Sequence, residues 1–306
     1  MVECKNMNTL IINNLASGAG AGAIYDMVRV LARDGSSVTL RSTDGTTDLR
    51  DLTHDAADFD VVVASGGDGT ISTVAYQLAG SDIPLLPFPA GTSNLLAQNT
   101  WLPGEVHALA ELARMGRRLC FDMGEVTLDS GKYGFCIMAG CGYDAVIMRD
   151  AKRVKKMFGP AAYFGAVVSN IAPTHAKIML EIDGEKHESE GVGVLLVNFS
   201  KIPFDLSVTH ENAPRDGLLD VVVLKANNAL ELLPVVGAAL LDKDGKNPDR
   251  ANLEIFRGRH IRIDADPALP IQYDGEPTSQ TTPFEANVMP GAMNMIISDA
   301  GYELFT

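Results

Sequence analysis

The residues most able to do chemistry lie in the stretch DVVVASGGDGT, residues 60–70. Its apolar half, residues 61–64, is typical of a strand buried on both faces of a parallel sheet. The glycines at 66 and 67 allow a tight turn, and apolar residues recur at helical spacing after Thr70. A strand, a glycine turn and a helix N-terminus bring backbone N–H groups together, which suits them to bind phosphate oxygens.

The aspartate inside this turn, Asp68, would repel a phosphate group unless a cation lay between the two. We therefore expect Asp68 either to bind Mg²⁺ or to act as a base toward an attacking hydroxyl group, and both roles belong to phosphoryl transfer. The alternative is a surface turn in which glycine and aspartate serve backbone geometry alone.

A second strand–loop–helix unit supports the phosphate interpretation. Residues 83–88 are expected to form a strand, and they lead into the loop PAGTSNLLA at residues 89–97. The carboxyl ends of neighbouring parallel strands meet at one edge of a sheet, so two loops of this composition can bind one polyphosphate there. Either loop taken alone could be an ordinary turn.

An earlier glycine-rich segment, after the strand predicted at residues 9–12, offers a different interpretation. Gly18, Gly20 and Ala23 fit the G-x-G-x-x-A pattern of dinucleotide-binding proteins. In that pattern the first glycine directly follows the strand, whereas residues 13–17 intervene here. The second predicted strand also ends at Arg41 rather than at an acidic residue, so we do not predict a dinucleotide site.

The GGDGT motif and the P-x-G-T-x-N loop together resemble the diacylglycerol kinase catalytic-domain family of lipid kinases, which includes bacterial diacylglycerol and sphingoid-lipid kinases. A D-G-E tripeptide at residues 274–276 and a P-G-A segment at residues 290–292 match the same family. The family shares its nucleotide fold with NAD kinases and phosphofructokinases. The resemblance therefore implies an N-terminal three-layer α/β nucleotide domain and a C-terminal antiparallel β-sandwich domain.

The sequence pattern changes near residue 120. From there on it predicts short strands with alternating residue types, separated by turn residues such as Asp183-Gly184. We expect residues 1–120 to form the ATP-binding α/β domain, with the tail 285–306 returning to it. Residues 121–284 are expected to form a β-rich domain that binds the lipid substrate.

The family resemblance implies ATP and Mg²⁺ as cofactors. The residues that match the family's nucleotide loops are Asn13, Ser17, Gly18, Thr43, Gly66, Gly67, Gly69, Thr70, Gly91, Thr92 and Asn94. Thr43, taken alone, could equally cap a turn. Four residues in and after these loops depart from the family pattern: Asn14 replaces a proline, Ser72-Thr73 replaces Asn-Glu, and Leu95 replaces an aspartate.

Three acidic residues beyond the nucleotide loops also match the family. Asp122 corresponds to an aspartate of a hydrogen-bond network near the active site, and a turn or strand-end aspartate is the alternative. Asp216 corresponds to a ligand of a structural Mg²⁺, and a plain Asp-Gly turn is the alternative. Glu276 ends the family's D-G-E tripeptide, which occurs again at residues 183–185 and can also serve as a simple hairpin turn.

Phosphoryl transfer requires neutralised phosphate charge, in-line positioning and a partner for the hydroxyl proton. We assign the metal and the orientation of the hydroxyl to Asp68 and the general base to Glu276, although two carboxylates facing one site can exchange or share these roles. The resemblance implies a primary hydroxyl acceptor on a membrane lipid, such as diacylglycerol, ceramide or a sphingoid base. An NAD kinase and a non-catalytic nucleotide- or lipid-binding regulator are the alternatives.

The charge of the chain limits its partners. A formal net charge of −14 over 306 residues disfavours nucleic acid and broad contact with an anionic membrane. Lys152, Arg153, Lys155 and Lys156 form a local basic cluster among apolar residues, which is either a membrane-surface helix or a solvated helix face. Free thiols, no signal peptide and no apolar stretch of the roughly 20 residues that span a bilayer predict a cytoplasmic protein with peripheral membrane contact.

Overall fold

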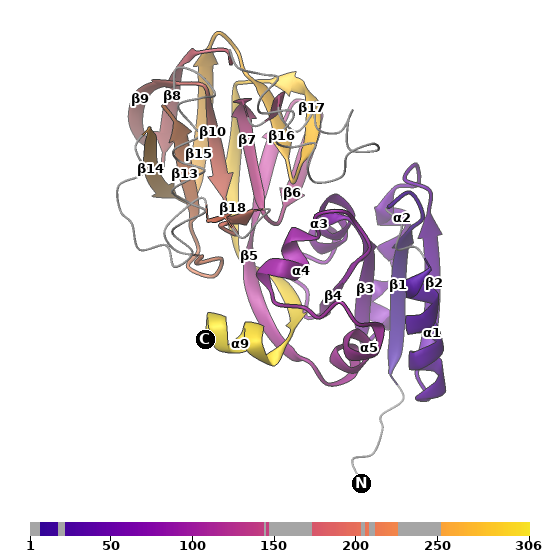
Figure 1. The fold of residues 1–306 in the computed structure, drawn as a ribbon. Helices are drawn as coiled ribbons and strands as arrows, with labels where there is room; N and C mark the ends of the chain where they lie inside the picture. Colours follow the sequence, from indigo (N-terminus) through magenta and orange to yellow (C-terminus); the bar gives the residue numbers. More distant parts are fainter. Residues whose placement is uncertain are drawn as a thin grey trace. The chain divides into compact units, whose positions relative to one another are not determined.

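Figure 1 shows the computed structural model, which describes residues 7–17, 22–143, 145–146, 173–202, 206–207, 212–225 and 252–306. Gly18, predicted at the nucleotide, and the basic cluster Lys152, Arg153, Lys155 and Lys156 lie outside the described residues. The chain folds into two compact units. Unit 1 comprises Met1–Phe121 and Gly291–Thr306, and unit 2 comprises Asp122–Pro290.

Unit 1 is built on a parallel sheet. In spatial order its strands are Ser37–Thr43 (β2), Asn8–Asn14 (β1), Val61–Gly66 (β3) and Leu85–Pro89 (β4), followed by the last part of Phe284–Ile297 (β18). All residues of β3 are buried, as expected for a strand that is covered on both faces. The apolar run at residues 61–64 is therefore a central strand.

Helices surround this sheet. They comprise Ala23–Arg33 (α1), Leu49–Thr53 (α2), Asp68–Gln77 (α3), Leu95–Asn99 (α4), Val106–Met115 (α5) and Asp299–Phe305 (α9), with a 3₁₀ turn at Ala56–Asp58. α1 and α5 share one buried cluster with Ile11 and Val63, while α3 packs against β3. Leu10 and Val62, which point to the other face of the sheet, are also fully buried. The predicted α/β architecture is confirmed.

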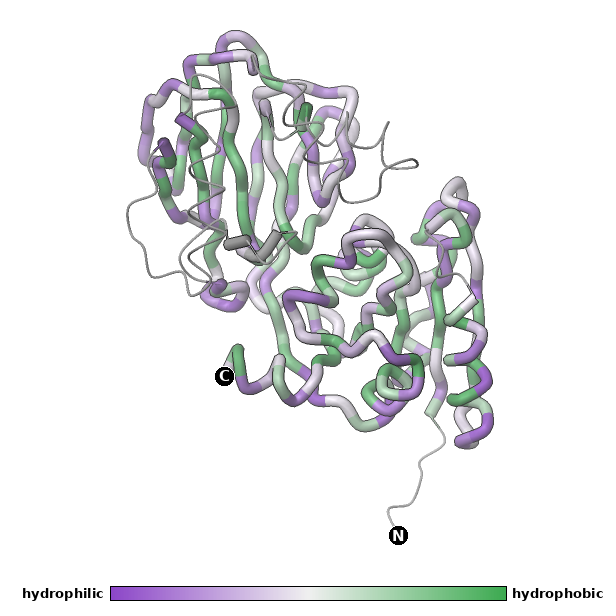
Figure 2. The backbone as a smooth tube through the Cα atoms, viewed as in Figure 1, coloured by the Kyte–Doolittle hydropathy of each residue, from purple (hydrophilic) through white to green (hydrophobic). Residues whose placement is uncertain are grey.

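The amphipathic pattern of α1 shows why this segment is a helix. Its buried residues Ile24, Met27 and Leu31 recur at helical spacing, and hydrophobic and hydrophilic segments alternate along it in Figure 2. The helix after the glycine turn begins at Asp68 rather than after Thr70, because Gly67 has an extended backbone and serves as the N-cap.

Unit 2 contains two antiparallel sheets. One has the order Leu253–Gly258 (β14), Leu219–Leu224 (β13), Gly193–Val197 (β10), Met138–Gly142 (β7), Pro270–Tyr273 (β16) and Glu276–Thr281 (β17). The other contains the first part of β18, His260–Asp266 (β15), Ala176–Ile182 (β8) and Glu185–Gly191 (β9), with Gly131–Phe135 (β6) paired to Arg117–Leu128 (β5). A short ladder joins Lys201–Ile202 (β11) to Leu206–Ser207 (β12).

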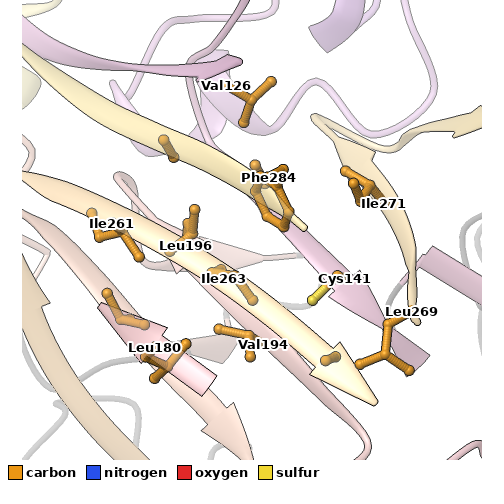
Figure 3. Close-up of a cluster of buried hydrophobic side chains, with 14 of the residues drawn as sticks. Val126, Cys141, Leu180, Val194, Leu196, Ile261, Ile263, Leu269, Ile271 and Phe284 are labelled. Carbon is orange, nitrogen blue, oxygen red and sulfur yellow. The ribbon is translucent and has the colours of Figure 1, made fainter. Parts of the chain in front are cut away.

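A buried hydrophobic cluster lies between the two sheets of unit 2 (Figure 3). Ile261 and Phe284 come from one sheet, and Val194 and Leu196 come from the other. Buried residues alternate with more exposed ones along β8 and β15, as expected for strands with one face toward the core. The predicted antiparallel β-sandwich is confirmed.

The sequence places the domain boundaries at residues 120 and 285, and the structure divides the chain after Phe121 and before Gly291. Both divisions fall within long strands, β5 and β18, which carry the chain from one unit to the other. No helix of the described residues is long and apolar enough to cross a membrane.

Candidate functional site

In unit 1, the loops after β3 and β4 touch each other through their glycines. A Cβ atom added at Gly91 would lie 2.5 Å from the Cα atom of Gly67. The Ala90 N–H also donates to the Gly66 carbonyl at 3.2 Å. Because the two backbones approach this closely, glycine is required at position 91, and the two predicted phosphate loops form one surface.

The loop after β4 is closed by its own asparagine. Asn94 has a left-handed backbone with φ of 48°, a conformation that asparagine tolerates better than most residues. Its Oδ1 accepts from the Gly91 N–H at 2.8 Å, and its Nδ2 donates to the Gly91 carbonyl at 3.1 Å. Asn94 therefore shapes the loop, while its contact with a nucleotide stays a prediction.

Asp68 connects the same two loops. It lies in the first turn of α3, and its Oδ1 accepts from the Leu96 N–H of α4 at 3.0 Å. This bond orients the carboxylate and satisfies one of the N–H groups that the start of α4 leaves without a helical partner. A carboxylate offers roughly four acceptor positions, so an oxygen of Asp68 can bind this N–H and a cation together.

The loop after β1 joins this arrangement through side chains. Asn14 Nδ2 donates to Thr70 Oγ1 at 2.8 Å, and Ser17 Oγ accepts from the Gly67 N–H at 3.3 Å. Asn13 Oδ1 accepts from Ser65 Oγ at 3.0 Å, but the fully buried Asn13 Nδ2 has no hydrogen-bond partner. Sequence analysis identified Asn14 only as the replacement of a family proline. An amide side chain at the end of a strand and next to a glycine loop is a signal that could have predicted its bond to Thr70.

Of the other predicted nucleotide residues, Thr43 ends β2 and Gly69 and Thr92 lie within the loops. Thr43 is buried at the end of β2, where its Oγ1 accepts from the Gly45 N–H at 3.0 Å. Its carbonyl accepts from the Leu15 N–H at 2.8 Å, which joins β2 to the loop after β1. Gly69 is the second residue of α3, and Thr92 is exposed.

The donor set of these loops fits a metal-bound nucleotide. The three loops supply amides, hydroxyl groups and the N-terminus of α3, and residues 13–17, 66–70 and 91–94 contain no lysine or arginine. The negative charge of a triphosphate would therefore require a cation, and Asp68 is the carboxylate placed to bind it. Mg²⁺ is commonly held by one or two carboxylates together with substrate phosphates, so a full set of protein ligands is not needed.

In unit 2, Asp122 belongs to a buried hydrogen-bond network. Its side chain is only 2% exposed, and its Oδ2 accepts from the Gly217 N–H at 2.7 Å. Its N–H donates to the Pro214 carbonyl at 2.8 Å. Asn198 Nδ2 donates both to the Asp122 carbonyl and to the Cys136 carbonyl, each at 2.8 Å.

Glu276 lies at the start of β17, where it is exposed. The turn before it is anchored by Asp274, whose carboxylate accepts from the N–H groups of residues 136, 137 and 138 at 2.6, 2.8 and 3.0 Å. Burial raises the pKa of Tyr273, which pairs with Glu276, and Tyr133, Glu276 and Asp274 add to this rise. The phenol of Tyr273 therefore stays protonated beside Glu276 at neutral pH.

The Asp216 carboxylate is paired with a guanidinium group. Asp216 Oδ2 binds Arg257, whose Nε also donates to Asp220 at 2.8 Å. Asp216 Oδ1 accepts from the Leu218 N–H at 3.0 Å. A positive group thus already lies at the position where a structural Mg²⁺ was expected, so the metal role of Asp216 stays a prediction and no chemical step depends on it.

The structure therefore brings together Asp122 and the Glu276 turn within unit 2, and the three loops around Asp68 within unit 1. Sequence analysis missed two members of the unit 2 network, Asn198 and the carboxylate of Asp274. Asn198 follows the apolar strand β10 and is buried. A polar residue that directly continues a buried strand is a signal that could have identified it.

Two family models match this chain. The diacylglycerol kinase catalytic domain matches residues 8–126, and the YegS C-terminal NAD kinase beta sandwich-like domain matches residues 138–297. Together they confirm the resemblance, the predicted fold and the predicted enzyme class, a phosphotransferase of the lipid kinase family with an alcohol acceptor. This class implies a lipid substrate, ATP use and usually a divalent metal.

Curated relatives are similar to this chain in sequence, and a solved structure shares its fold. An uncharacterized protein of Synechocystis is 30% identical over 76% of this chain, which spans only 54% of that relative. The "Diacylglycerol kinase" of Bacillus subtilis is 28% identical over 77% of this chain and 78% of its own length, and the "Probable lipid kinase YegS-like" of Pectobacterium atrosepticum is 29% identical over 95% and 96%. A crystal structure of a diacylglycerol kinase from Bacillus anthracis, 21% identical, superposes with a TM-score of 0.74 over 96% of this chain and 98% of its own.

Proposed function

Because the chain belongs to the diacylglycerol kinase catalytic-domain family, we propose that it is an ATP-dependent kinase of membrane lipids. It transfers the γ-phosphoryl group of ATP to the primary hydroxyl of diacylglycerol, ceramide or a sphingoid base. The observation that supports this most directly is the contact of three loops around Asp68 in unit 1, through Gly91, Asn14 and the Leu96 N–H.

In this proposal the loops of unit 1 hold the nucleotide. Bound Mg²⁺–ATP supplies the phosphoryl group together with a cation that neutralises its charge. The hydroxyl groups of Ser17 and Thr70 and the N-terminus of α3 bind phosphate oxygens, while Gly66, Gly67 and Gly91 let the backbone approach them. Asp68, held by Leu96, binds the metal and orients the acceptor hydroxyl.

Glu276 of unit 2 is the proposed general base, which accepts the proton of the acceptor hydroxyl. Asp68 is the other carboxylate that could take this role. Asp122 supports the acceptor side from the buried network of unit 2. A structural Mg²⁺ at Asp216 would have to compete with Arg257.

The proposed enzyme acts from the cytoplasm at a membrane surface. The acceptor lipids are held in bilayers, and no helix among the described residues can cross one. Lys152, Arg153, Lys155 and Lys156 are the proposed contact with anionic lipid headgroups. Replacing all four by glutamine should abolish binding to anionic vesicles, and unchanged binding would remove this part of the proposal.

The decisive experiment is a transfer assay with γ-labelled ATP in mixed micelles that contain diacylglycerol, ceramide or sphingosine, with NAD as a soluble acceptor. We expect label in one of the lipids only with Mg²⁺ present, and not with the Asp68→Asn variant. Label in NAD would instead identify an NAD kinase. Binding of ATP without transfer to any acceptor would indicate a non-catalytic regulator.

A further inference from the structure

Unit 2 contains two D-G-E turns with nearly the same backbone. Asp183 and Gly184 have φ values of 51° and 89°, and Asp274 and Gly275 have φ values of 44° and 78°. In each hairpin the residue before the aspartate pairs with the glutamate, Ile182 with Glu185 and Tyr273 with Glu276. Positive φ at both central residues is typical of type I′ hairpins with two-residue loops, so the two turns are matched in local structure.

The two aspartates differ in what they hold. The Asp183 carboxylate accepts from the N–H groups of Arg259, which lies between β14 and β15, and His260, the first residue of β15, and both residues are exposed. The Asp274 carboxylate accepts from three consecutive N–H groups, those of residues 136–138, and these residues are buried. The Asp274 N–H also donates to the Met138 carbonyl at 2.8 Å.

The segment 136–138 is in turn fixed by Asn198 through its carbonyl groups. The Asn198 N–H donates to the Ile137 carbonyl at 2.9 Å, and its Nδ2 donates to the Cys136 carbonyl at 2.8 Å. The same Nδ2 donates to the Asp122 carbonyl. The turn that carries Glu276 is therefore bound to a buried segment that Asn198 links to the Asp122 carbonyl, whereas the turn that carries Glu185 is bound to exposed residues.

We propose that Asp274 is a positioning residue, which fixes Glu276 by binding the N–H groups of the buried segment 136–138. This inference rests on the proposed function, in which Glu276 is the general base. Charge-assisted hydrogen bonds to a carboxylate are stronger than those to a neutral amide, and both Asp274 oxygens are used. Loss of these bonds frees the turn to move, and displacement of a catalytic group by about 1 Å can cost about 10²-fold in rate.

The test is a double-mutant cycle that combines Asp274→Ala with Glu276→Gln in the full chain, assayed with γ-labelled ATP and the accepted lipid. We expect Asp274→Ala to lower kcat about 10²-fold, with the KM for ATP unchanged. If Asp274 acts only through Glu276, the double variant should turn over no more slowly than Glu276→Gln alone. Additive losses would mean that Asp274 has an independent, structural role and would overturn the proposal.

Asp183→Ala is the matched control because it removes the same kind of anchor from the same kind of turn. Its kcat should stay at the wild-type value, and its Tm should fall less than that of Asp274→Ala, because the N–H groups that it frees are exposed to water. An equal fall of kcat in both variants would overturn the proposal. Asp274→Asn, which keeps an oxygen for the N–H groups of residues 137 and 138, should recover part of kcat and replaces the alanine variant in the cycle if the latter does not fold.

The outcomes also separate this inference from the function on which it rests. Wild-type turnover in Glu276→Gln would remove the base assignment and the positioning role with it. A large fall of kcat in Glu276→Gln together with a wild-type kcat in Asp274→Ala would overturn only the positioning role of Asp274. Absence of transfer to any lipid in the wild-type protein would instead remove the proposed function.

Discussion

The two units hold their polar residues in different ways. In unit 1, the loops after β1, β3 and β4 meet through close backbone approach at Gly67 and Gly91 and through short side-chain bonds. In unit 2, Asn198 and Asp274 come from distant parts of the chain and bind the buried backbone of residues 136–138, and Asn198 also binds the Asp122 carbonyl. The unit 1 site should therefore be sensitive to added bulk, and the unit 2 network to lost hydrogen bonds.

The largest expected effect is in unit 1, at the carboxylate that joins its loops. Asp68→Asn keeps an oxygen that can accept from the Leu96 N–H, so the loops should retain their contact. We expect kcat to fall by at least about 10²-fold, a typical contribution of a group that transfers or orients a proton. Steady-state kinetics at saturating ATP and lipid, with Tm as the folding control, measure this. Near-wild-type turnover would show that Asp68 neither binds the metal nor orients the acceptor hydroxyl.

The second largest effect is expected from a substitution that tests the close approach of the two glycine loops. Gly91→Ala would place a Cβ atom 2.5 Å from the Cα atom of Gly67 and 2.9 Å from Asn94 Oδ1. We expect stability to fall by about 1–3 kcal/mol, as in other overpacked sites, and nucleotide affinity to fall about tenfold or more. Calorimetric titration with Mg²⁺–ATP and urea unfolding measure the two.

Gly104→Ala is the control for this substitution. A Cβ atom at Gly104 would meet nothing within 4 Å, and Gly104 is not among the glycines with positive φ. Its nucleotide affinity and stability should match those of the wild type. If Gly91→Ala behaves in the same way as this control, the two loops do not form one surface.

A smaller effect is expected in the network of unit 2, where a substitution should lower stability but leave nucleotide affinity unchanged. Asn198→Ala removes the donors to the carbonyl groups of Asp122 and Cys136 and leaves both buried. An intramolecular hydrogen bond contributes about 0.5–1.5 kcal/mol, so the loss of these two should lower the free energy of unfolding in urea by about 1–3 kcal/mol. Affinity for Mg²⁺–ATP should not change, and a loss of affinity would contradict the assignment of nucleotide binding to the loops of unit 1 alone.

The control in unit 2 is an asparagine with a hydrogen-bond partner at the surface. Asn287 Oδ1 contacts His260 Nδ1 at 2.6 Å in an exposed position. Asn287→Ala should change stability by less than about 0.5 kcal/mol, as most surface substitutions do. An equally large loss at Asn287 and Asn198 would show that burial of the network does not decide its contribution.

The smallest effect concerns an ion pair outside both regions. Hydrogen bonds from Arg41 lower the pKa of Asp55 from 3.8 to about 2. Since the folded-state pKa is lowered, the stabilisation from Asp55 is present above about pH 4 and is lost as the pH falls toward 2. The decrease of Tm between pH 5 and pH 2 should be shallower in Asp55→Asn, and identical curves would contradict the shift.

Local motifs explain how much of unit 1 could be predicted from the sequence. The apolar run 61–64, the glycines at 66 and 67, and the loop at 89–97 each follow their own strand, and a parallel sheet brings such strand ends to one edge. The roles of Asn14 and Asn94 within the loops could not be predicted, because they depend on which amide meets which backbone group.

The network of unit 2 could not be predicted because its bonds join residues far apart in the sequence. Asp274 binds N–H groups that precede it by more than a hundred residues. The sequence distinguished its two D-G-E turns only through the match of residues 274–276 to the family, since their local backbones are matched. Burial and long-range partners, which only the fold supplies, separate them.

The central claim is that the loops around Asp68 position a metal-bound ATP for transfer to a lipid hydroxyl. The most direct measurement is the rate of label transfer from γ-labelled ATP to lipid, compared between wild type and Asp68→Asn at nucleotide concentrations that saturate both. The account predicts transfer by the wild type and a loss of at least about 10²-fold in the variant. Equal rates in the two proteins, or no lipid labelling by the wild type, would contradict it.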